Sequence, residues 1–293
     1  MSSYQLEAFE PSDRGDYVAL LGDAWGHQGL SGKEFDWWFL RNPAGSLMSV
    51  ARAGGRVVAV AAHTLLRMVL GGEERTASFS VHATTAPEFR GRGIFAGLEA
   101  KHEREAEERG VAVVLAFASA PTAPIFLGPL GWTEIARMRI WARPVPWAGD
   151  VTPIGAFDTE GDAAASWPNH VVRDARHLAW RYLDSPRGYI ALRSPGGYAV
   201  VWPAKPYRGR TIAVLADLAA PREELPGLLR QAARASRARV LFGLPAPNQR
   251  AAFVRAGFVP TNRTLHFMGK ALDGPLDLDP AGWRFTLGDT DFF

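Results

Sequence analysis

The residues best suited to bind an anion lie at positions 84–95, whose sequence is TTAPEFRGRGIF. Arginine and glycine alternate in the middle of this stretch, at Arg90, Gly91, Arg92 and Gly93. A run that alternates apolar and polar residues precedes it at 77–83, and a run rich in Glu, Ala, Arg and Lys follows it at 95–109. These patterns predict a strand, a loop and a helix. The first helical turn exposes backbone N–H groups, and glycine allows close approach, so the spacing predicts a phosphate site.

Two common nucleotide-binding motifs are absent from this stretch. The sequence has no G-x-x-x-x-G-K-[ST], and no G-x-G-x-x-G after a first strand with an acidic residue about twenty positions later. The loop instead resembles the pyrophosphate loop of the GNAT family of N-acetyltransferases, whose pattern is Arg/Gln-x-x-Gly-x-Gly/Ala. Arg90 and Gly93 match that pattern, and Phe95 departs from it at the last position.

The resemblance implies cofactor roles for residues on both sides of the loop. In GNAT enzymes the strand before the loop diverges from the strand that follows the helix, and pantetheine binds in the gap like an added β-strand. Here that role falls on His82, Ala83 and Thr84, with Thr85 at the turn. The pyrophosphate would bind chiefly to backbone N–H groups of Arg90, Gly91, Arg92, Gly93 and Ile94. Ser119 is the nearest residue to an asparagine that is common in relatives.

The reaction that the resemblance implies is direct attack of an amine on a thioester, which needs a base and an acid. The usual acid is a tyrosine, and its position is occupied here by Leu127. His82 is the best candidate for the base, because the reference pKa of histidine suits removal of a proton from an ammonium group. A histidine that only forms hydrogen bonds within a strand is the alternative. Some tandem GNAT enzymes use a C-terminal carboxylate as base, which here would belong to Phe293.

Composition restricts the class of protein further. Hydrophobic residues make up 47% and charged residues 22% of the 293 residues, which is typical of a soluble globular protein. There is no cysteine, which excludes disulfides, thiolate zinc sites and a cysteinyl acyl-enzyme. The formal charge of +3, with arginines spread along the chain, does not favour nucleic-acid binding. With no signal peptide and no apolar run able to span a bilayer, we expect a cytoplasmic protein without a membrane partner.

The order of expected elements predicts an α/β fold of the α+β type, in which a mixed sheet is flanked by helices. We expect two tandem GNAT-like domains, at residues 1–143 and 167–293, joined by a linker at 144–166 that is rich in Pro and Gly. The pattern around Trp37 recurs around Trp180, which favours a duplication. A homodimer is compatible with these features.

The second expected domain differs from the first at one point. Strand 211–218 leads directly into helix 222–237, with no Gly-x-Gly or Arg-Gly at the junction. We therefore expect a similar frame without the anion site, so that only the N-terminal domain binds acyl-CoA.

The leading functional interpretation is an acyl-CoA-dependent N-acyltransferase, most simply one that uses acetyl-CoA. Its acceptor would be the primary amine of a small molecule, such as an amino sugar, an aminoglycoside-like compound or a biosynthetic intermediate. One alternative is a non-catalytic acyl-CoA-binding scaffold, favoured by Leu127 and Phe253 at tyrosine positions. Another is an aminoacyl or peptidyl-type transferase that uses aminoacyl-tRNA, although such proteins lack the Arg-Gly-x-Gly loop. No metal is expected, because the seven histidines show no H-x-x-x-H pairing.

Overall fold

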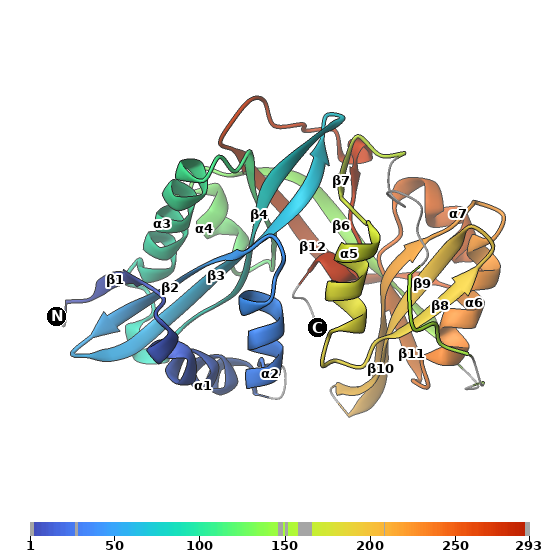
Figure 1. The fold of residues 1–293 in the computed structure, drawn as a ribbon, viewed down its shortest axis with the longest axis horizontal. Coiled ribbons are helices and arrows are strands. Elements are labelled where there is room, and N and C mark those ends of the chain that lie inside the picture. The colour runs from blue at the N-terminus through green and yellow to red at the C-terminus, as the bar shows by residue number, and fades with distance from the viewer. Residues whose placement is uncertain are drawn as a thin grey trace. The chain divides into compact units, whose positions relative to one another are not determined.

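The computed structural model describes residues 3–26, 29–145, 149, 152–157, 166–207 and 209–290 (Figure 1). The chain forms two compact units, each assembled from several segments. Unit 1 comprises Met1–Met68, Glu74–Ala136 and His266–Leu278, and unit 2 comprises Val69–Glu73, Arg137–Leu265 and Asp279–Phe293. The fold is the mixed α/β type expected from the sequence, but each unit contains segments from both halves of the chain rather than one contiguous range.

The exchange of segments is carried largely by two strands. Strand β6 (Thr133–Pro144) contributes its residues from 137 onward to unit 2, and strand β12 (Val259–Ala271) contributes its residues from 266 onward to unit 1. Within unit 1, β12 pairs antiparallel with β5 (Val113–Ala118) over six residue pairs. The backbone groups at the edge of a strand need hydrogen-bond partners, but any part of the chain can supply them. Each unit here is therefore completed by a strand from a distant part of the sequence.

The sheet of unit 1 has the strand order β1-β2-β3-β4-β5-β12. Its first four strands are β1 (Gln5–Ala8), β2 (Ser46–Ala53), β3 (Arg56–Leu70) and β4 (Glu73–Thr85). Pairs β1–β2, β2–β3 and β5–β12 are antiparallel, whereas β4–β5 is parallel, so the sheet is mixed. The helical segments of this unit are η1 (Pro11–Asp13), α1 (Arg14–Trp25), α2 (Gly32–Phe35), the π-helical η3 (Asp36–Leu40), η4 (Pro87–Phe89), α3 (Ile94–Glu108) and α4 (Ala123–Leu127).

Unit 2 has the strand order β12-β6-β11-β10-β9-β8, with β7 paired to β13. Its strands are β7 (Asn169–Val171), β8 (Ile190–Ser194), β9 (Gly197–Tyr207), β10 (Arg210–Ala219), β11 (Val240–Gly243) and β13 (Trp283–Arg284). Its helical segments are α5 (Ala175–Leu178), the π-helical η5 (Ala179–Leu183), α6 (Leu225–Ala235), η6 (Pro247–Gln249), α7 (Arg250–Arg255), η7 (Pro280–Gly282) and η8 (Leu287–Asp289). Pair β10–β11 is parallel, like β4–β5 in unit 1.

The two segments that share the tryptophan pattern also share a local structure. Helix α2 begins with a cap in which Ser31 accepts from the Glu34 N–H, and α5 begins with one in which Asp174 accepts from the His177 N–H. Each helix continues into a π-helical turn, and each turn is followed by an antiparallel hairpin. A side-chain acceptor at the cap satisfies an otherwise unpaired N–H, which explains why both helices start where they do.

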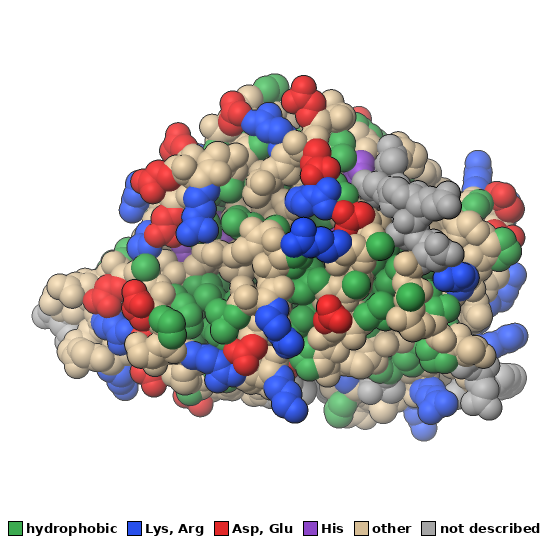
Figure 2. Space-filling model, viewed as in Figure 1, with side chains coloured by type: hydrophobic (Ala, Val, Ile, Leu, Met, Phe, Trp, Pro, Cys, Tyr) green, Lys and Arg blue, Asp and Glu red, His purple; other side chains and the backbone are tan. Residues whose placement is uncertain are grey.

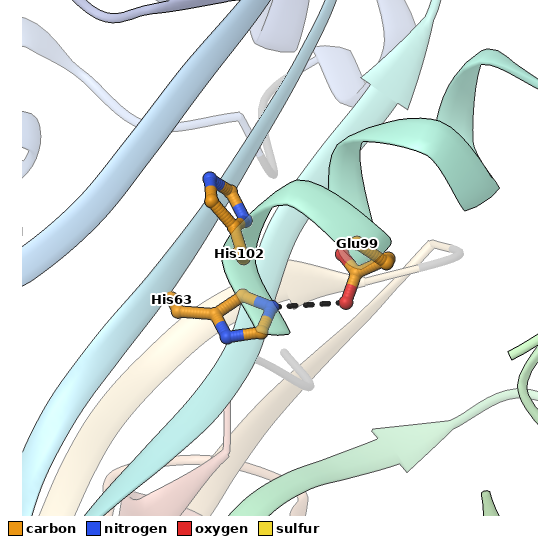
Figure 3. Close-up of side chains that lie close together, drawn as sticks. All are labelled: His63, Glu99 and His102. Atoms are coloured by element: carbon orange, nitrogen blue, oxygen red, sulfur yellow. Dashed lines mark hydrogen bonds and ion pairs between the residues drawn. The ribbon is translucent and has the colours of Figure 1, made fainter. Parts of the chain in front are cut away.

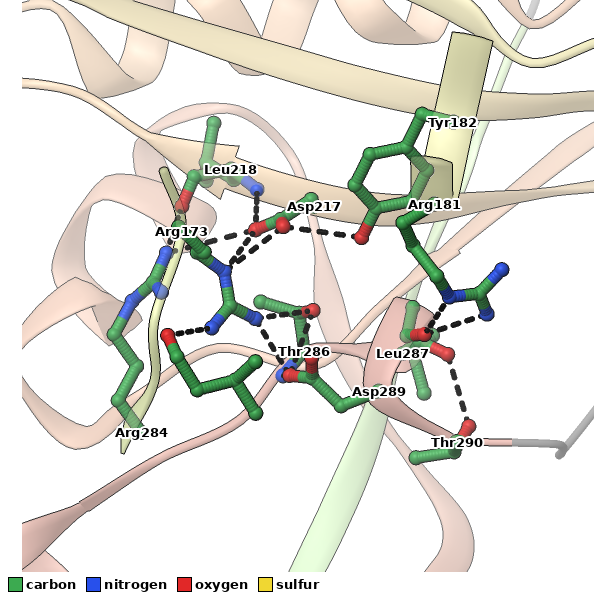
Figure 4. Close-up of polar contacts among 12 residues, drawn as sticks. Arg173, Arg181, Tyr182, Asp217, Leu218, Arg284, Thr286, Leu287, Asp289 and Thr290 are labelled. Atoms are coloured by element: carbon green, nitrogen blue, oxygen red, sulfur yellow. Dashed lines mark hydrogen bonds and ion pairs between the residues drawn. The ribbon is translucent and has the colours of Figure 1, made fainter. Parts of the chain in front are cut away.

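The aromatic C-terminal segment packs into unit 2, where residues 283–290 are all buried. Two arginines hold it. Arg173 Nη2 lies 2.6 Å from Asp289 Oδ2 (Figure 4). Arg181 Nη2 donates to the Gly288 carbonyl at 2.6 Å. Phe293, whose terminal carboxylate the sequence analysis names as a candidate base, lies outside the described residues.

Among the helices of the described ranges, none combines the length and the apolar character required to cross a membrane.

Candidate functional site

The loop between β4 and α3 has an open backbone. Gly91 and Gly93 have φ values of +73° and +75°, in the left-handed region that disfavours residues with a Cβ atom. A Cβ atom built on either glycine would meet nothing within 4 Å. Both glycines singled out in the sequence are therefore required by the turn, and both face open space.

The first turn of α3 presents unused hydrogen-bond donors. The first intrahelical bond runs from the Gly97 N–H to the Gly93 carbonyl at 2.9 Å. The N–H groups of Ile94, Phe95 and Ala96 donate to no other group within the described part of the chain, and the N-cap Gly93 supplies no side chain. Such a turn carries partial positive charge and binds phosphate through its amides.

Phe95 stands where the family pattern has Gly or Ala, but its ring packs away from the start of α3. The Phe95 ring packs edge-on against Phe126, with centroids 5.6 Å apart, in an apolar cluster that also contains Trp132. Side chains on a helix point back towards its N-terminus, and this one reaches the cluster instead of the loop.

Basic side chains surround the loop and are held by short-range contacts. Arg90 Nε donates to the Thr85 carbonyl at 3.0 Å, and Arg92 Nη2 donates to the Glu88 carbonyl at 2.8 Å. Arg56 Nη2 lies 2.5 Å from Glu88 Oε1. The pKa of Glu88 lies below its ordinary value, because its own backbone N–H and then Arg56 stabilise the carboxylate. Glu88 is thus a partner of Arg56 beside the loop.

The charge on the molecular surface is mixed. On the face shown in Figure 2, Lys and Arg side chains are interspersed with Asp and Glu side chains and form no single continuous positive region. This arrangement agrees with the small formal charge of +3.

Strand β4 leaves β5 just before the loop. The parallel register runs from Ala77–Val113 to Ser80–Ala116, and β4 then continues to Thr85. His82 lies two residues past the last pair and has a φ of +50°. Positive φ is uncommon for a residue other than glycine, and such strained positions cluster at functional sites. Ala83, Thr84 and Thr85, the residues to which the resemblance assigned pantetheine, follow directly and are half-buried.

His82 is oriented by aromatic rings from η3. Its ring lies edge-on to Trp38, with centroids 4.9 Å apart, and to Phe39, at 5.9 Å. Trp38 is itself fixed by a hydrogen bond from its Nε1 to Thr64 Oγ1 at 2.6 Å. Trp37 and Trp38 are buried core residues. The contact of Trp38 with His82 was not predicted, because no local pattern links η3 to β4.

Ser119 and Leu127 lie at the two ends of the segment that follows β5. The Ser119 N–H donates to Thr122 Oγ1 at 3.1 Å, and the Ser119 carbonyl accepts from the N–H groups of Thr122 and Ala123. Ser119 therefore organises the start of α4. The Leu127 side chain is 44% exposed, while the adjacent Phe126 is buried. The usual tyrosine position is thus at the surface but carries no acid.

The structure also brings together a second group of polar side chains, which the sequence analysis missed. His63 from β3 and Glu99 and His102 from α3 lie close together and are fully buried. The spacing Glu-x-x-His in α3 places both side chains on one helix face, and this spacing was the signal available in the sequence.

Comparison with known proteins identifies relatives of this fold. A family model described as an acetyltransferase (GNAT) domain matches residues 6–135. No curated protein sequence matches significantly. A GCN5-related N-acetyltransferase from Anabaena variabilis is 12% identical, with a TM-score of 0.67 over 92% of this chain and 73% of that one. One from Kribbella flavida is 17% identical, with a TM-score of 0.61 over 93% and 72%. Saccharomyces cerevisiae N-myristoyltransferase with bound myristoyl-CoA is 10% identical, with a TM-score of 0.66 over 92% and 83%. At these identities the likeness is one of fold.

Proposed function

We propose that this chain, whose residues 6–135 match the model of an acetyltransferase (GNAT) domain, transfers an acyl group from acyl-CoA to a primary amine of a small molecule. Acetyl-CoA is the simplest donor. The observation that carries the proposal is the row of unused N–H groups at the start of α3, directly after a strand that has left its neighbour. The N–H groups could bind a diphosphate, and the edge of β4 beside them could bind an extended chain such as pantetheine.

The donor would bind along β4 and the loop. Its diphosphate would accept hydrogen bonds from the N–H groups of Gly91, Gly93 and residues 94–96, with Arg90 and Arg92 within reach of the phosphate oxygens. Its pantetheine arm would pair with the backbone of residues 83–85, which continue beyond the parallel register with β5.

The transfer step would use few side chains. His82 would accept the proton that the ammonium form of the acceptor must lose before it can attack. The amine nitrogen then forms a bond to the thioester carbon, and the bond from that carbon to sulfur breaks, so that the sulfur leaves as CoA thiolate. The nitrogen loses a second proton as the amide forms, and the thiolate takes up this proton to give CoA thiol. A thiol of ordinary acidity, with a pKa of about 8.5, is a fair leaving group without a dedicated acid. The lack of tyrosine at Leu127 is therefore compatible with turnover.

Calorimetry with acetyl-CoA tests donor binding. The wild-type chain is expected to bind, and Arg90→Glu is expected to weaken binding by about tenfold, which corresponds to the loss of one charge-assisted contact. Arg222→Glu is the matched control, because Arg222 precedes α6 in unit 2, and its affinity should equal the wild type. Equal affinity in Arg90→Glu would remove the phosphate assignment.

A thiol-release screen tests turnover. Acetyl-CoA is supplied with amino sugars, aminoglycosides and other small primary amines, and release of CoA thiol is measured. Binding without release for any amine would favour the scaffold alternative, for which the exposed Leu127 at the acid position is the relevant observation.

A further inference from the structure

Glu99 is the centre of a buried polar group between α3 and the sheet of unit 1 (Figure 3). Its Oε2 lies 2.9 Å from His63 Nε2, and its Oε1 accepts a hydrogen bond from Ser80 Oγ at 3.0 Å. His102 follows one helical turn later, and its ring centroid lies 4.6 Å from that of His63. The side chains of His63, Glu99 and His102 have no exposed surface. Three groups able to ligate a metal therefore converge in the core.

Each histidine ring has one nitrogen held by a serine. His63 Nδ1 lies 2.8 Å from Ser78 Oγ, and His102 Nε2 lies 3.0 Å from Ser49 Oγ. This leaves His63 Nε2 directed at Glu99, and His102 Nδ1 buried with no hydrogen-bond partner among the described residues. Histidines that ligate metals are typically oriented in this way, through a hydrogen bond on the nitrogen remote from the metal.

The ring of His102 is incompletely satisfied among the described residues. A buried ring nitrogen without a hydrogen-bond partner loses its hydration and gains nothing in return. Imidazole and carboxylate groups both ligate metals through lone pairs. A cation between these side chains would take the lone pair of His102 Nδ1 and lie against His63 Nε2 and the Glu99 carboxylate.

We propose that His63, Glu99 and His102 bind one divalent cation, zinc in the first instance. Imidazole nitrogen and carboxylate oxygen are both common zinc ligands, and one ligand atom from each residue lies within 4.8 Å of the others. The sequence analysis expected no metal. Glu99 is five residues after Ile94, about 7.5 Å along the helix, so the ion would join the helix of the anion loop to β3. Its role is to fix α3, and it is independent of acyl transfer.

Elemental analysis of the full-length protein, purified without chelator, tests the proposal directly. The expected result is one zinc ion per chain. The metal-free protein, prepared with a chelator in mild denaturant and refolded, should bind Zn²⁺ with a rise in its unfolding midpoint. Addition of Co²⁺ should give the visible absorption of a four-coordinate site.

Variants locate the ion. Glu99→Gln and His102→Gln should each lose the zinc, because each removes a ligand. Ser49→Ala keeps all three ligands and should weaken Zn²⁺ binding by about 10- to 100-fold, because it releases the ring of His102. His266→Gln is the control, since His266 pairs with Glu134 elsewhere in unit 1, and it should retain one zinc.

Two results would overturn the proposal. One is a wild-type chain with no stoichiometric metal whose metal-free form does not respond to Zn²⁺, Co²⁺, Fe²⁺ or Mn²⁺; the cluster would then be a hydrogen-bonded network only. The other is full zinc retention by both Glu99→Gln and His102→Gln, which would place the ion elsewhere. The first result is measured on the wild-type chain, so it can contradict the proposal even if a variant fails to fold.

Discussion

Strand β4 leads into α3 in unit 1, and strand β10 leads into α6 in unit 2. Both strands pair in parallel with the strand that follows the helix and then leave it, with last pairs Ser80–Ala116 and Val214–Phe242. A backbone irregularity follows each departure: His82 has positive φ in β4, and the pairing of β10 with β9 shifts between Leu215 and Asp217. Each unit therefore has a strand that leaves its parallel neighbour before a helix, and the two units differ in the groups around this junction.

The loops differ in how the helix start is used. Before α3, Gly91 and Gly93 leave the N–H groups of the first turn open. Before α6, the Pro221 carbonyl accepts from the N–H groups of Glu224 and Leu225, and the first turn contains Pro226, which has no N–H. Glu223 and Glu224, which come just before the first residue of α6, also disfavour an anion. An anion site thus requires more than a strand followed by a helix.

The ends of the strands differ in the same sense. His82 of β4 is half-buried beside aromatic rings, with the backbone of residues 83–85 beyond it. Asp217 of β10 is buried and bonded to Arg173 Nε at 2.9 Å and to the Tyr182 hydroxyl at 3.0 Å, and the Leu218 carbonyl accepts from Arg284 Nη2 at 2.6 Å (Figure 4). In unit 2, side chains of the protein bind the polar groups at the end of β10. In unit 1, a ligand is proposed to bind the backbone at the end of β4.

The largest effect is expected from breaking the network of unit 2. Asp217→Asn leaves the buried Arg173 and Arg284 without their shared counter-ion, and should lower the free energy of unfolding by about 3–5 kcal/mol. Urea unfolding measures it. The control Asp273→Asn affects an exposed pair with Arg75 and should cost less than about 1 kcal/mol. A similar small cost for Asp217→Asn would mean that the network does not hold unit 2 together.

The same carboxylate predicts an acid-sensitive stability. Burial alone would raise the pKa of Asp217, but Arg173 and then Arg284 outweigh it and hold the pKa below its ordinary value. The stabilisation is therefore complete above the unfolded pKa of about 3.9 and is lost as pH falls below it. Urea midpoints measured from pH 6 downward should fall more steeply for the wild type than for Asp217→Asn. Parallel curves would contradict this assignment.

A smaller effect is expected at the counterpart position in β4. His82→Asn keeps a residue that tolerates positive φ and removes the proposed base, so kcat should fall by about 100-fold with little change in acetyl-CoA affinity. Arg237→Asn is the matched control, because Arg237 also has positive φ, +48°, but lies in unit 2. An unchanged kcat across pH in His82→Asn would show that the base is another group.

Replacement of a loop glycine separates backbone strain from ligand binding. Gly93→Ala and Gly209→Ala both place a Cβ atom at a φ of +75° in open space, so each should cost about 1–2 kcal/mol of stability. Only Gly93→Ala should weaken acetyl-CoA binding, by about tenfold or more, because it alters the N-cap of α3. Equal affinity in both variants would contradict the assignment of Gly93 to the phosphate site, because Gly209 lies in the turn between β9 and β10.

The smallest effect is expected at the tyrosine positions. Leu127 is exposed, so Leu127→Tyr should change stability by less than about 0.5 kcal/mol. Phe253 is 1% exposed, so Phe253→Tyr would bury a hydroxyl at a cost of about 1–3 kcal/mol. Thermal unfolding of both variants measures the difference. A larger loss for Leu127→Tyr would contradict the exposed position of this side chain.

The sequence alone determined the features that depend on neighbouring residues. Gly91 and Gly93 lie between a run that alternates apolar and polar residues and a run rich in Glu, Ala, Arg and Lys, and this pattern predicted a loop between a strand and a helix. The structure has β4 and α3 on the two sides of that loop. The expected lack of an anion site before residues 222–237 stays a prediction. Such features can be read from the sequence because turn preference and periodicity act over a few residues.

The tertiary structure alone decided which distant residues meet. It exchanged strands β6 and β12 between the units, placed His82 against Trp38, and joined Arg173 to Asp217 and Asp289. It also brought His63 to Glu99 and His102, across 36 residues or more of chain. Buried polar groups must find partners wherever the fold places them, and that pairing depends on the register and twist of a whole sheet, which no local pattern specifies.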